Sequence, residues 1–329
     1  MPAGLADRVL VVRLGAIGDV ANALIVATAI KQSHPDVQVG WAVHDLALPL
    51  VDGHPSVDRV HLWRRGGGME GFSSFLREVR AERYGLVIDL QRIFKSALVA
   101  RLSHAPRTLG FDRARAKEGS WMWTREKIPP GDPGAHMVLQ YLEFVRHLGL
   151  PSYALHELPA HPEADAWAAE LVDELARPPI VLNLGASKKP NRWPPERFGQ
   201  LARWIVDEQG TPVCLTGGPG DAELGDAAWR TLGAEPQARN LVGATSLPQL
   251  IALLRRARLV VSCDTGAMHL AAAVGTPIVA LFGPADPGRT GPWGDQHRVV
   301  RAPGIAGSMA EIGVELVRSA VHEQLLALR

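Results

Sequence analysis

The chain has 329 residues, of which 47% are hydrophobic and 21% are charged. These proportions are typical of a soluble globular protein with enough apolar surface for two domains of ordinary size, and they exclude a disordered chain. Lysine and arginine total 35 against 34 aspartates and glutamates, a formal net charge of +1. That balance gives no general reason to bind nucleic acid or an anionic membrane. A charged partner would therefore have to bind at a local patch of charged residues.

The cysteines and the first residues indicate the compartment. Cys214 and Cys263, the two cysteines of the sequence, lie in apolar strand-like runs, which predicts buried thiols and neither a disulfide framework nor a metal site. The first eight residues lead directly into a predicted strand, and no apolar run approaches about eighteen residues. We therefore expect a cytoplasmic protein without a signal peptide or a membrane-spanning helix.

The first half of the chain alternates apolar strand-like runs with helical segments. Strands are predicted at residues 8–14, 37–43, 57–63 and 84–90. The alternation predicts a parallel, doubly wound α/β sheet. A glycine turn at 15–18 follows the first strand and precedes a helix over 20–32, for which Asp19 is the expected N-cap. Because the glycine spacing is not G-x-G-x-x-G, no NAD site is predicted.

Prolines near the middle of the chain indicate a domain boundary. Residues 151–179 carry prolines at both ends and one predicted helix between them. We therefore expect an N-terminal domain at 1–155, a linker at 156–178, a C-terminal domain at 179–308, and a final helix at 309–329 that packs back across the linker.

The second half repeats the strand and helix alternation. Strands are predicted to begin at 179, 211, 259 and 277, with helices at 197–209, 247–256 and 267–274. The tripeptide Leu184-Gly-Ala186 repeats Leu14-Gly-Ala16 after the first strand of each half. This short echo is consistent with two similar domains.

The turn between the strand at 259–261 and the helix at 267–274 is a predicted anion site. Thr265 and Gly266 can present backbone N–H groups at the positive end of the helix, and His269 lies in its first turn. A diphosphate suits such a turn. The competing interpretation is that Asp264 or Thr265 caps the helix and His269 is a partly buried structural residue.

The turn and its surroundings resemble a known signature. The sequence Asp264-Thr-Gly266, followed by His269 and by the glycine-rich and proline-rich residues 283–294, is similar to the C-terminal signature of the lipopolysaccharide heptosyltransferases, glycosyltransferase family 9. The resemblance implies that the turn holds the donor diphosphate and that Asp264 meets the donor sugar.

Two N-terminal motifs extend the resemblance over most of the chain. The family pattern G-D-[VIL] after the first strand is matched at Asp19, to which the resemblance assigns the role of catalytic base. The family block D-x-Q-x-x-x-K-S is matched from Asp89 to Ser96. Arg92 stands where the family usually has a glycine. This difference can alter how the acceptor packs against the protein, or can add a positive charge that binds the acceptor.

A basic segment before Trp193-Pro194 resembles the family segment in which a serine or threonine and a lysine hold the donor phosphates. Ser187 matches the first role. Asn191 stands at the lysine position, so the resemblance leaves that role to Lys188, Lys189 or Arg192.

An acidic residue after the strand that begins at 211 is expected to bind the donor ribose, because a carboxylate can accept both ribose hydroxyl hydrogens. The resemblance implies a glutamate, and Glu223 and Asp221 both match. Helix capping by Asp221 is the competing interpretation.

Positive charge is concentrated in the first half of the chain. Residues 91–127 contain nine lysines and arginines and three acids, an excess of six, together with Phe111, Trp121 and Trp123. One interpretation is a solvated face and the other is a surface for an anionic, partly lipidic acceptor. The acceptor-binding residues expected here and nearby are Arg64, Arg65, Arg92 and Lys95.

The resemblance implies a glycosyltransferase B fold, in which two Rossmann-like doubly wound sheets face a cleft with the active site. It further implies inverting transfer of heptose from ADP-L-glycero-D-manno-heptose to Kdo or heptose of the lipopolysaccharide inner core. No Asp-x-Asp triplet occurs, so we expect a metal-independent enzyme without a cofactor. A monomer that binds no nucleic acid and works at the inner face of the cytoplasmic membrane is expected.

Other functions remain open at this point. A sugar-nucleotide 2-epimerase shares the two-domain architecture, and a family member with another nucleotide sugar or acceptor has the same motifs. A binding protein with a decayed site is a third alternative, against which the joint presence of Asp19, Asp264 and His269 counts.

Overall fold

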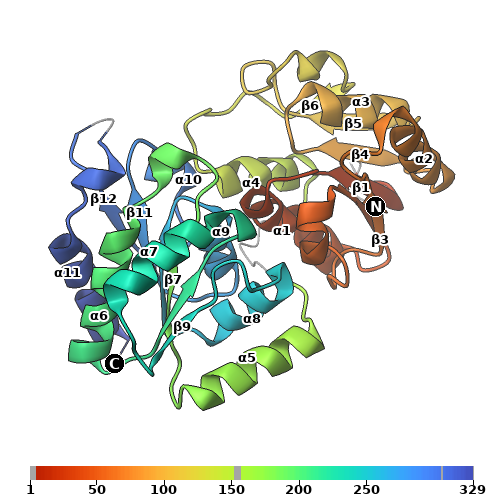
Figure 1. Cartoon of the computed structure of the whole chain (residues 1–329). Coiled ribbons are helices and arrows are strands. Elements are labelled where there is room, and N and C mark those ends of the chain that lie inside the picture. The colour runs from red at the N-terminus through yellow and green to blue at the C-terminus, as the bar shows by residue number, and fades with distance from the viewer. Residues whose placement is uncertain (1–4, 152–156, 305–306, 329) are drawn as a thin grey trace. The chain divides into compact units, whose positions relative to one another are not determined.

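A computed structural model describes residues 5–151, 157–304 and 307–328. The chain divides into two compact units, Met1–Pro159 and Ala160–Arg329. In the described residues each unit contains one six-stranded sheet with helices on both faces (Figure 1). This arrangement confirms the prediction of two doubly wound α/β halves.

The first unit is built on a sheet with the order β3-β2-β1-β4-β5-β6. Its strands are β1 (Arg8–Val12), β2 (Gln38–Val43), β3 (Arg59–Leu62), β4 (Leu86–Asp89), β5 (Arg107–Gly110) and β6 (Glu126–Lys127). The helices α1 (Ile17–Ser33) and α4 (Met137–His147) pack together on one face, and α2 (Gly68–Ala81) and α3 (Phe94–Leu102) cover the other. Because both faces are covered, the central strands are apolar and buried.

The second unit has the order β12-β11-β10-β7-β8-β9. Its strands are β7 (Ile180–Asn183), β8 (Val213–Thr216), β9 (Ala238–Asn240), β10 (Leu259–Cys263), β11 (Ile278–Phe282) and β12 (Arg298–Arg301). On one face α6 (Pro195–Gln209) contacts both α7 (Ala222–Leu232) and α11 (Val314–Ala327), and on the other α8 (Leu247–Arg256) contacts α5 (Pro162–Glu174) and α9 (Gly266–Ala273). Short helices are η1 (Asp45–Leu50), η2 (Ser120–Met122), η3 (Lys189–Asn191), η4 (Pro219–Asp221), α10 (Pro287–Thr290) and η5 (Met309–Glu311).

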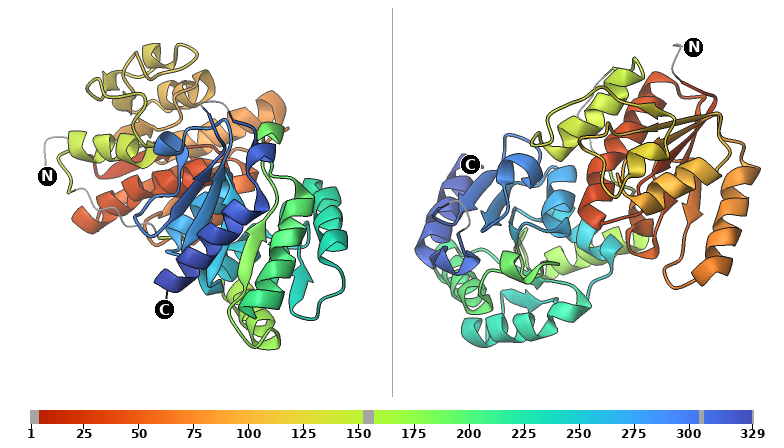
Figure 2. Two further views of the ribbon diagram at one scale, coloured as in Figure 1. Left: turned by 90° about the vertical axis from the view of Figure 1, so that its left-hand side faces the viewer. Right: turned by 90° about the horizontal axis from the view of Figure 1, so that it is seen from above.

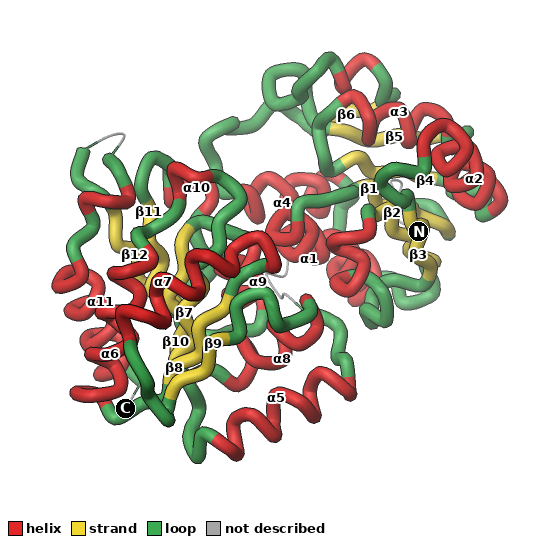
Figure 3. The backbone as a smooth tube through the Cα atoms, viewed as in Figure 1, coloured by secondary structure: helices red, strands yellow, loops and turns green. Residues whose placement is uncertain are grey.

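Both sheets follow one connection pattern. In each unit the first strand lies at the centre, the next two strands extend to one side and the remaining three to the other, and every pairing between neighbouring strands is parallel. The order in which strands are added therefore reverses between the neighbouring strands β1 and β4 in the first sheet, and between β7 and β10 in the second. Ligands of such sheets bind outside the carboxyl ends of the strands at this reversal. Figures 2 and 3 show the helical layers and the connecting loops.

The helix after β1 begins earlier than the sequence predicts. Helix α1 starts at Ile17 with Ala16 as its N-cap, so Asp19 lies inside the first turn and the prediction that it is the N-cap is wrong. Gly18, which we had expected in the turn, is a buried residue of the helix.

The two cysteines are free and buried, as predicted. Cys214 lies in β8 and Cys263 ends β10, and burial raises the pKa of each thiol to about 12. Both are therefore protonated side chains of the apolar core at neutral pH.

The segments around the predicted linker belong to the second unit's packing. Helix α5 contacts α8 through Ala164, Ala168 and Ala252. Helix α11 contributes Val317 and other buried apolar residues at four-residue spacing to the core of the second unit. Contact of the final helix with the linker stays a prediction, and residues 152–156 lie outside the described residues. No helix in the described part of the chain is long and apolar enough to cross a membrane.

Candidate active site

The turn between β10 and α9 carries the start of a helix whose N-cap side chain makes no capping hydrogen bond. Strand β10 is buried along its whole length, so it fixes the turn at the carboxyl edge of the sheet. Thr265 occupies the N-cap position of α9, but its side chain makes no capping hydrogen bond. The first N–H groups of α9, beginning at Gly266, therefore have no intrahelical acceptor and no side-chain cap. Together with the helix dipole, they form a site for an anion.

Asp264 connects this turn to the loop after β7. The side-chain amide of Asn191 donates a hydrogen bond to the Asp264 carboxylate at 3.2 Å. The amide of Asn183, at the end of β7, donates to Ser262 and to the carbonyl of Gly185. The hydrogen bond between Asn191 and Asp264 therefore joins the two loops at the carboxyl edge of the second sheet.

Arg192 and Asp221 connect the β7 loop to the loop after β8. The guanidinium of Arg192 donates to the Ala186 carbonyl at 3.0 Å and to the Asp221 carboxylate at 3.1 Å. A Cβ atom at Gly185 would overlap the Asp221 carboxylate, so a larger residue there would displace this side chain. Asp221 also accepts from the backbone N–H of Gly218. The predicted donor residues Arg192 and Asp221 are thus in direct contact.

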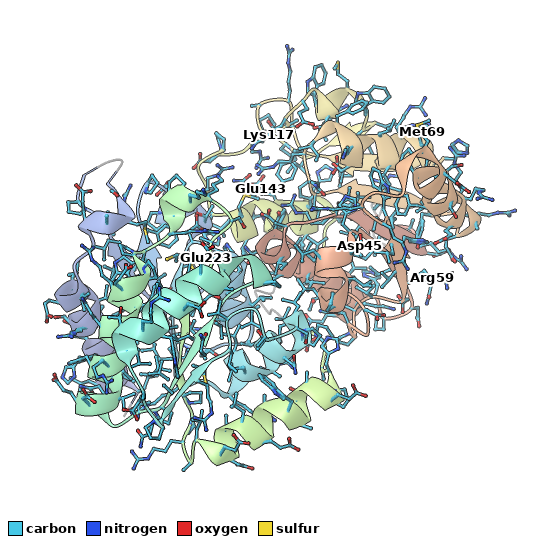
Figure 4. The ribbon with its side chains drawn as sticks, in the orientation of Figure 1. Asp45, Arg59, Met69, Lys117, Glu143 and Glu223 are labelled. Atoms are coloured by element: carbon cyan, nitrogen blue, oxygen red, sulfur yellow. The ribbon has the colours of Figure 1, made fainter. Side chains whose placement is uncertain are left out.

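The other predicted donor residues differ in exposure. Ser187, Lys188 and Lys189 lie on the β7 loop with solvent-exposed side chains. His269 is half-buried one turn into α9. Glu223 is exposed in the first turn of α7 (Figure 4). Of these two acids, Asp221 is therefore the one whose carboxylate is held between the loops after β7 and β8.

Asp19 lies at the corresponding reversal point of the first sheet. Its carboxylate forms an ion pair with the guanidinium of Arg13, the residue that follows β1. The Arg13 side chain is buried whereas that of Asp19 is 40% exposed. The Asp19 carboxylate is therefore accessible to solvent while a buried guanidinium holds it in place. The loop is held further by the backbone N–H of Leu14, which donates to the Gln91 side chain at 2.6 Å, and by Trp41, which donates to the Arg13 carbonyl.

Arg13 stays charged despite its burial. Burial alone lowers the pKa of this guanidinium, but Tyr141, Asp19 and Asp89 more than offset the effect, and the pKa is raised above its usual value. A buried cation needs compensating anions. The ion pair with Asp19 therefore compensates the buried charge of Arg13 and stabilises the loop after β1.

Asp89 ends β4 beside this pair. Burial raises the pKa of its carboxyl group from 3.8 to about 6. The carboxylate accepts a hydrogen bond from the backbone N–H of Gln91 at 2.9 Å, which opposes the shift without cancelling it. This residue matches the first position of the family's D-x-Q block, and its role in the structure is to shape the turn that carries Gln91.

We expect Asp89 to make the stability of the protein depend on pH. Between about pH 4 and about pH 6 the folded state holds a proton that the unfolded state has lost, so the free energy of unfolding falls as pH rises through this window. Over this window the titration of Asp89 should lower the free energy of unfolding by on the order of 3 kcal/mol. Urea unfolding at several pH values should show this fall in the wild type and a flatter profile in Asp89→Asn. Asp226→Asn, at an exposed position of α7, is the matched control and should keep the wild-type slope.

A hollow of about 700 Å³ lies at the carboxyl edge of the first sheet. Its lining comes from the segments that follow β2, β3 and β4, and consists of His44, Trp63, Arg64, Arg65, Gly66, Gly68, Gln91, Ile93 and Lys95. Three of the four predicted acceptor residues are therefore brought together in one hollow. Lys95 lies 5.9 Å from the centre of the Trp63 ring, and Asp45 (Figure 4) accepts the backbone N–H of Arg65 and holds its loop.

His44 and Gln91 were not predicted as site residues. Nδ1 of His44 lies 2.6 Å from the Trp63 carbonyl, which can only accept, so Nδ1 carries the proton and Nε2 is the acceptor of the neutral ring. Burial lowers the pKa of His44, and the charges of Arg65 and Lys95 act in the same direction. The hollow thus combines cations with a neutral imidazole. Each residue comes shortly after a predicted strand, which is the signal that could have identified it.

Arg92 is directed away from the other acceptor candidates. Its guanidinium lies over the Phe111 ring at 5.0 Å and donates to Gln140 and Met137 of α4. Its backbone has φ of 68°, a conformation that favours glycine. The resemblance implies a glycine at this position, and glycine adopts such a conformation without strain. Contact of Arg92 with an acceptor stays a prediction.

The basic segment 91–127 is not one continuous patch. Arg115 is buried and pairs with Asp112 at 2.5 Å and with Glu143 of α4 at 2.6 Å (Figure 4). Arg107 pairs with Glu126 at 2.6 Å. Phe111, which we had expected on the amphipathic surface, is instead buried against Phe144. The exposed cations are Lys95, Arg101, Arg113, Lys117 and Arg125.

Comparison with known proteins finds a matching family and relatives that cover most of the chain. A family model described as glycosyltransferase family 9 (heptosyltransferase) matches residues 72–312. The chain is 31% identical over 303 residues to lipopolysaccharide heptosyltransferase 1 of Pseudomonas aeruginosa, covering 87% of this chain and 81% of that protein.

Solved structures show the same fold. The structure of E. coli ADP-heptose lps heptosyltransferase II has a TM-score of 0.83 and 25% identity, covering 97% of this chain and 99% of that one. E. coli heptosyltransferase WaaC with ADP has a TM-score of 0.79 and 26% identity, covering 96% and 99%. These similarities confirm the resemblance seen in the motifs, and this glycosyltransferase belongs to family 9, the heptosyltransferase family.

Proposed function

We propose that the protein transfers heptose from ADP-L-glycero-D-manno-heptose to the lipopolysaccharide inner core, with inversion at the anomeric carbon and without a metal ion. The observation that carries this proposal is the uncapped N-terminus of α9, joined through Asp264 and Asn191 to the basic loop after β7. A relative with this fold is described as a heptosyltransferase with ADP, which supports ADP as the leaving group.

The donor site would use residues of the second unit. The N–H groups of Thr265 and Gly266 and the side chain of His269 would bind the diphosphate, because backbone donors at a helix N-terminus favour an anion. Ser187, Lys188 and Lys189 lie exposed on the adjoining loop, where they can reach phosphate oxygens. Asp221 would bind the ribose and Asp264 the donor sugar, with Arg192 holding Asp221 in place.

The acceptor would bind in the hollow of the first unit. Arg64, Arg65 and Lys95 would offer positive charge to acceptor carboxylates or phosphates, and Trp63 contributes apolar surface to the lining. In the transfer step, the acceptor oxygen attacks the anomeric carbon as the bond to the diphosphate breaks. Asp19 takes the acceptor proton, and the leaving diphosphate is stabilised by the α9 donors and the basic loop.

A direct assay tests this proposal against its alternatives. The protein is incubated with ADP-heptose, with and without lipid A that carries Kdo. Acceptor-dependent transfer supports the proposal. Isomerisation or hydrolysis of the donor without an acceptor would instead indicate a sugar-nucleotide epimerase, and release of ADP only with another acceptor or donor would indicate a family member of different specificity.

Lys95→Glu should separate the acceptor site from the donor site. We expect the acceptor KM to rise about tenfold, since a charge-assisted contact becomes a repulsion. ADP affinity, measured by calorimetry, should not change. Arg101→Glu reverses an exposed charge on the same helix outside the hollow and is the matched control. An equal loss of donor affinity in Lys95→Glu would show that Lys95 is not an acceptor residue.

The proposal extends to location and assembly. We infer a monomeric enzyme of the cytoplasm that meets a lipid-linked acceptor at the inner face of the membrane. The positive charge of the hollow suits such an anionic acceptor. Analytical ultracentrifugation tests the assembly state.

A further inference from the structure

Four large apolar residues lie at the start of α3 and in or next to η2, two elements that contact each other. Phe94, at the start of α3, lies edge to face with Trp123 at 5.3 Å. Met122 of η2 is 64% exposed and Phe94 is 40% exposed, while Trp121 and Trp123 are half-buried. Ile93 and Lys95 line the hollow, so Phe94 connects the hollow directly to this apolar group.

Cations surround the same side chains. Arg113 lies 4.9 Å from the centre of the Trp121 ring, and both Arg113 and Lys117 are exposed. Glu118 is the neighbouring acid, and its carboxylate accepts the backbone N–H of Phe94 at 3.1 Å, which holds the start of α3 against the loop. The group therefore presents apolar and aromatic tips with positive charge at its border. Figure 4 labels Lys117.

We propose that Phe94, Arg113, Lys117, Trp121, Met122 and Trp123, here called the interfacial patch, dock the protein on an anionic lipid bilayer. Tryptophan side chains favour the boundary between lipid and water because one end is apolar and the other is polar. Lysine and arginine near the membrane surface are attracted to anionic headgroups. Since the protein as a whole is nearly neutral, attraction to lipid has to come from such a local group.

This inference deepens the proposed function. A lipid-linked acceptor is anchored by its acyl chains, so its sugar can enter the hollow only if the hollow is held at the membrane surface. The patch adjoins the hollow along the chain at Ile93, Phe94 and Lys95. Docking would place the acceptor entrance within reach of headgroups and would raise the local acceptor concentration.

Vesicle flotation of the full chain tests the patch. Wild-type protein should bind phosphatidylcholine vesicles that contain phosphatidylglycerol and bind vesicles of phosphatidylcholine alone much more weakly. Added salt should reduce binding. Met122→Ser should weaken partition about tenfold through loss of apolar insertion, and Lys117→Glu should weaken it about tenfold through loss of attraction to the headgroups.

The control is Leu316→Ser, at an exposed apolar residue of α11 far from the patch in sequence. It should leave vesicle binding unchanged. Equal loss in this control, equal binding to neutral vesicles, or no binding by the wild type would overturn the inference. A dimer in ultracentrifugation that dissociates in Met122→Ser would also overturn it, because the patch would then be a protein interface.

Failure of the patch can be distinguished from failure of the proposed function. Transfer to a water-soluble acceptor fragment without acyl chains should be the same in Met122→Ser and in wild type. Transfer to acceptor in anionic vesicles should fall about tenfold in the variant. If soluble transfer is present but no vesicles are bound, the glycosyltransferase proposal stands and the docking surface is wrong.

Discussion

Asp19→Asn is expected to lower kcat by about 10²- to 10⁴-fold while ADP affinity stays at the wild-type value. An amide cannot take up the proton of the acceptor hydroxyl, and loss of a general base typically has an effect of this size. The position of Asp19 supports this result, because its carboxylate is partly exposed at the carboxyl edge of the first sheet and is held by Arg13. Steady-state kinetics with saturating donor and acceptor measures the change.

The same substitution also tests a structural role. Asn removes the charge that compensates buried Arg13, so some loss of stability is expected, and unfolding must be measured beside activity. Asp19→Glu, which keeps the charge with a longer side chain, should recover stability more than activity. A folded Asp19→Asn protein with wild-type kcat, when chemistry limits turnover, would remove Asp19 from the mechanism.

His269→Ala is expected to weaken ADP binding about 10- to 100-fold. The side chain lies one turn after the uncapped start of α9, where it can donate to a phosphate oxygen. A hydrogen bond to a charged group contributes about 1.5 to 3 kcal/mol. Calorimetry with ADP measures the change directly and needs no acceptor.

His322→Ala is the matched control for His269, since it removes an exposed imidazole from α11 in the same unit. It should leave ADP affinity unchanged. Unchanged affinity in a folded His269→Ala protein would separate His269 from the diphosphate and leave binding to the backbone donors of the turn alone.

Much of the second unit's site is visible in the sequence because it is local. The apolar run of β10, the small residues of α9 and the turn between them lie within fifteen residues of sequence, from Leu259 to Ala273. Local pattern and turn chemistry are sufficient to place Thr265 at a helix start. The side-chain contacts Asn191 to Asp264 and Arg192 to Asp221 could not be predicted, because they join loops that only the strand order brings together.

In the first unit, the count of charged residues does not show which of them are buried and paired. The excess charge of residues 91–127 predicts a basic surface, yet Arg115 is buried and pairs with an acid outside this segment, Glu143 of α4. Charge counts cannot detect such pairing. Similarly, the hollow needs His44, Trp63 and Gln91 from three different strand ends, and no short motif records that convergence.

The strand order described above leaves four edge strands, β3, β6, β9 and β12, whose outer backbone groups are not paired within their own sheets. Such edges are templates for unwanted pairing between molecules. Here each edge strand has four residues or fewer and carries at least one charged side chain, as in Arg298 and Arg301 at the two ends of β12. A short strand with charged residues gives an approaching chain little length to pair with and requires it to desolvate a charge. Short, charged edges of this kind oppose edge-to-edge pairing at the positions where an open sheet is most exposed to it.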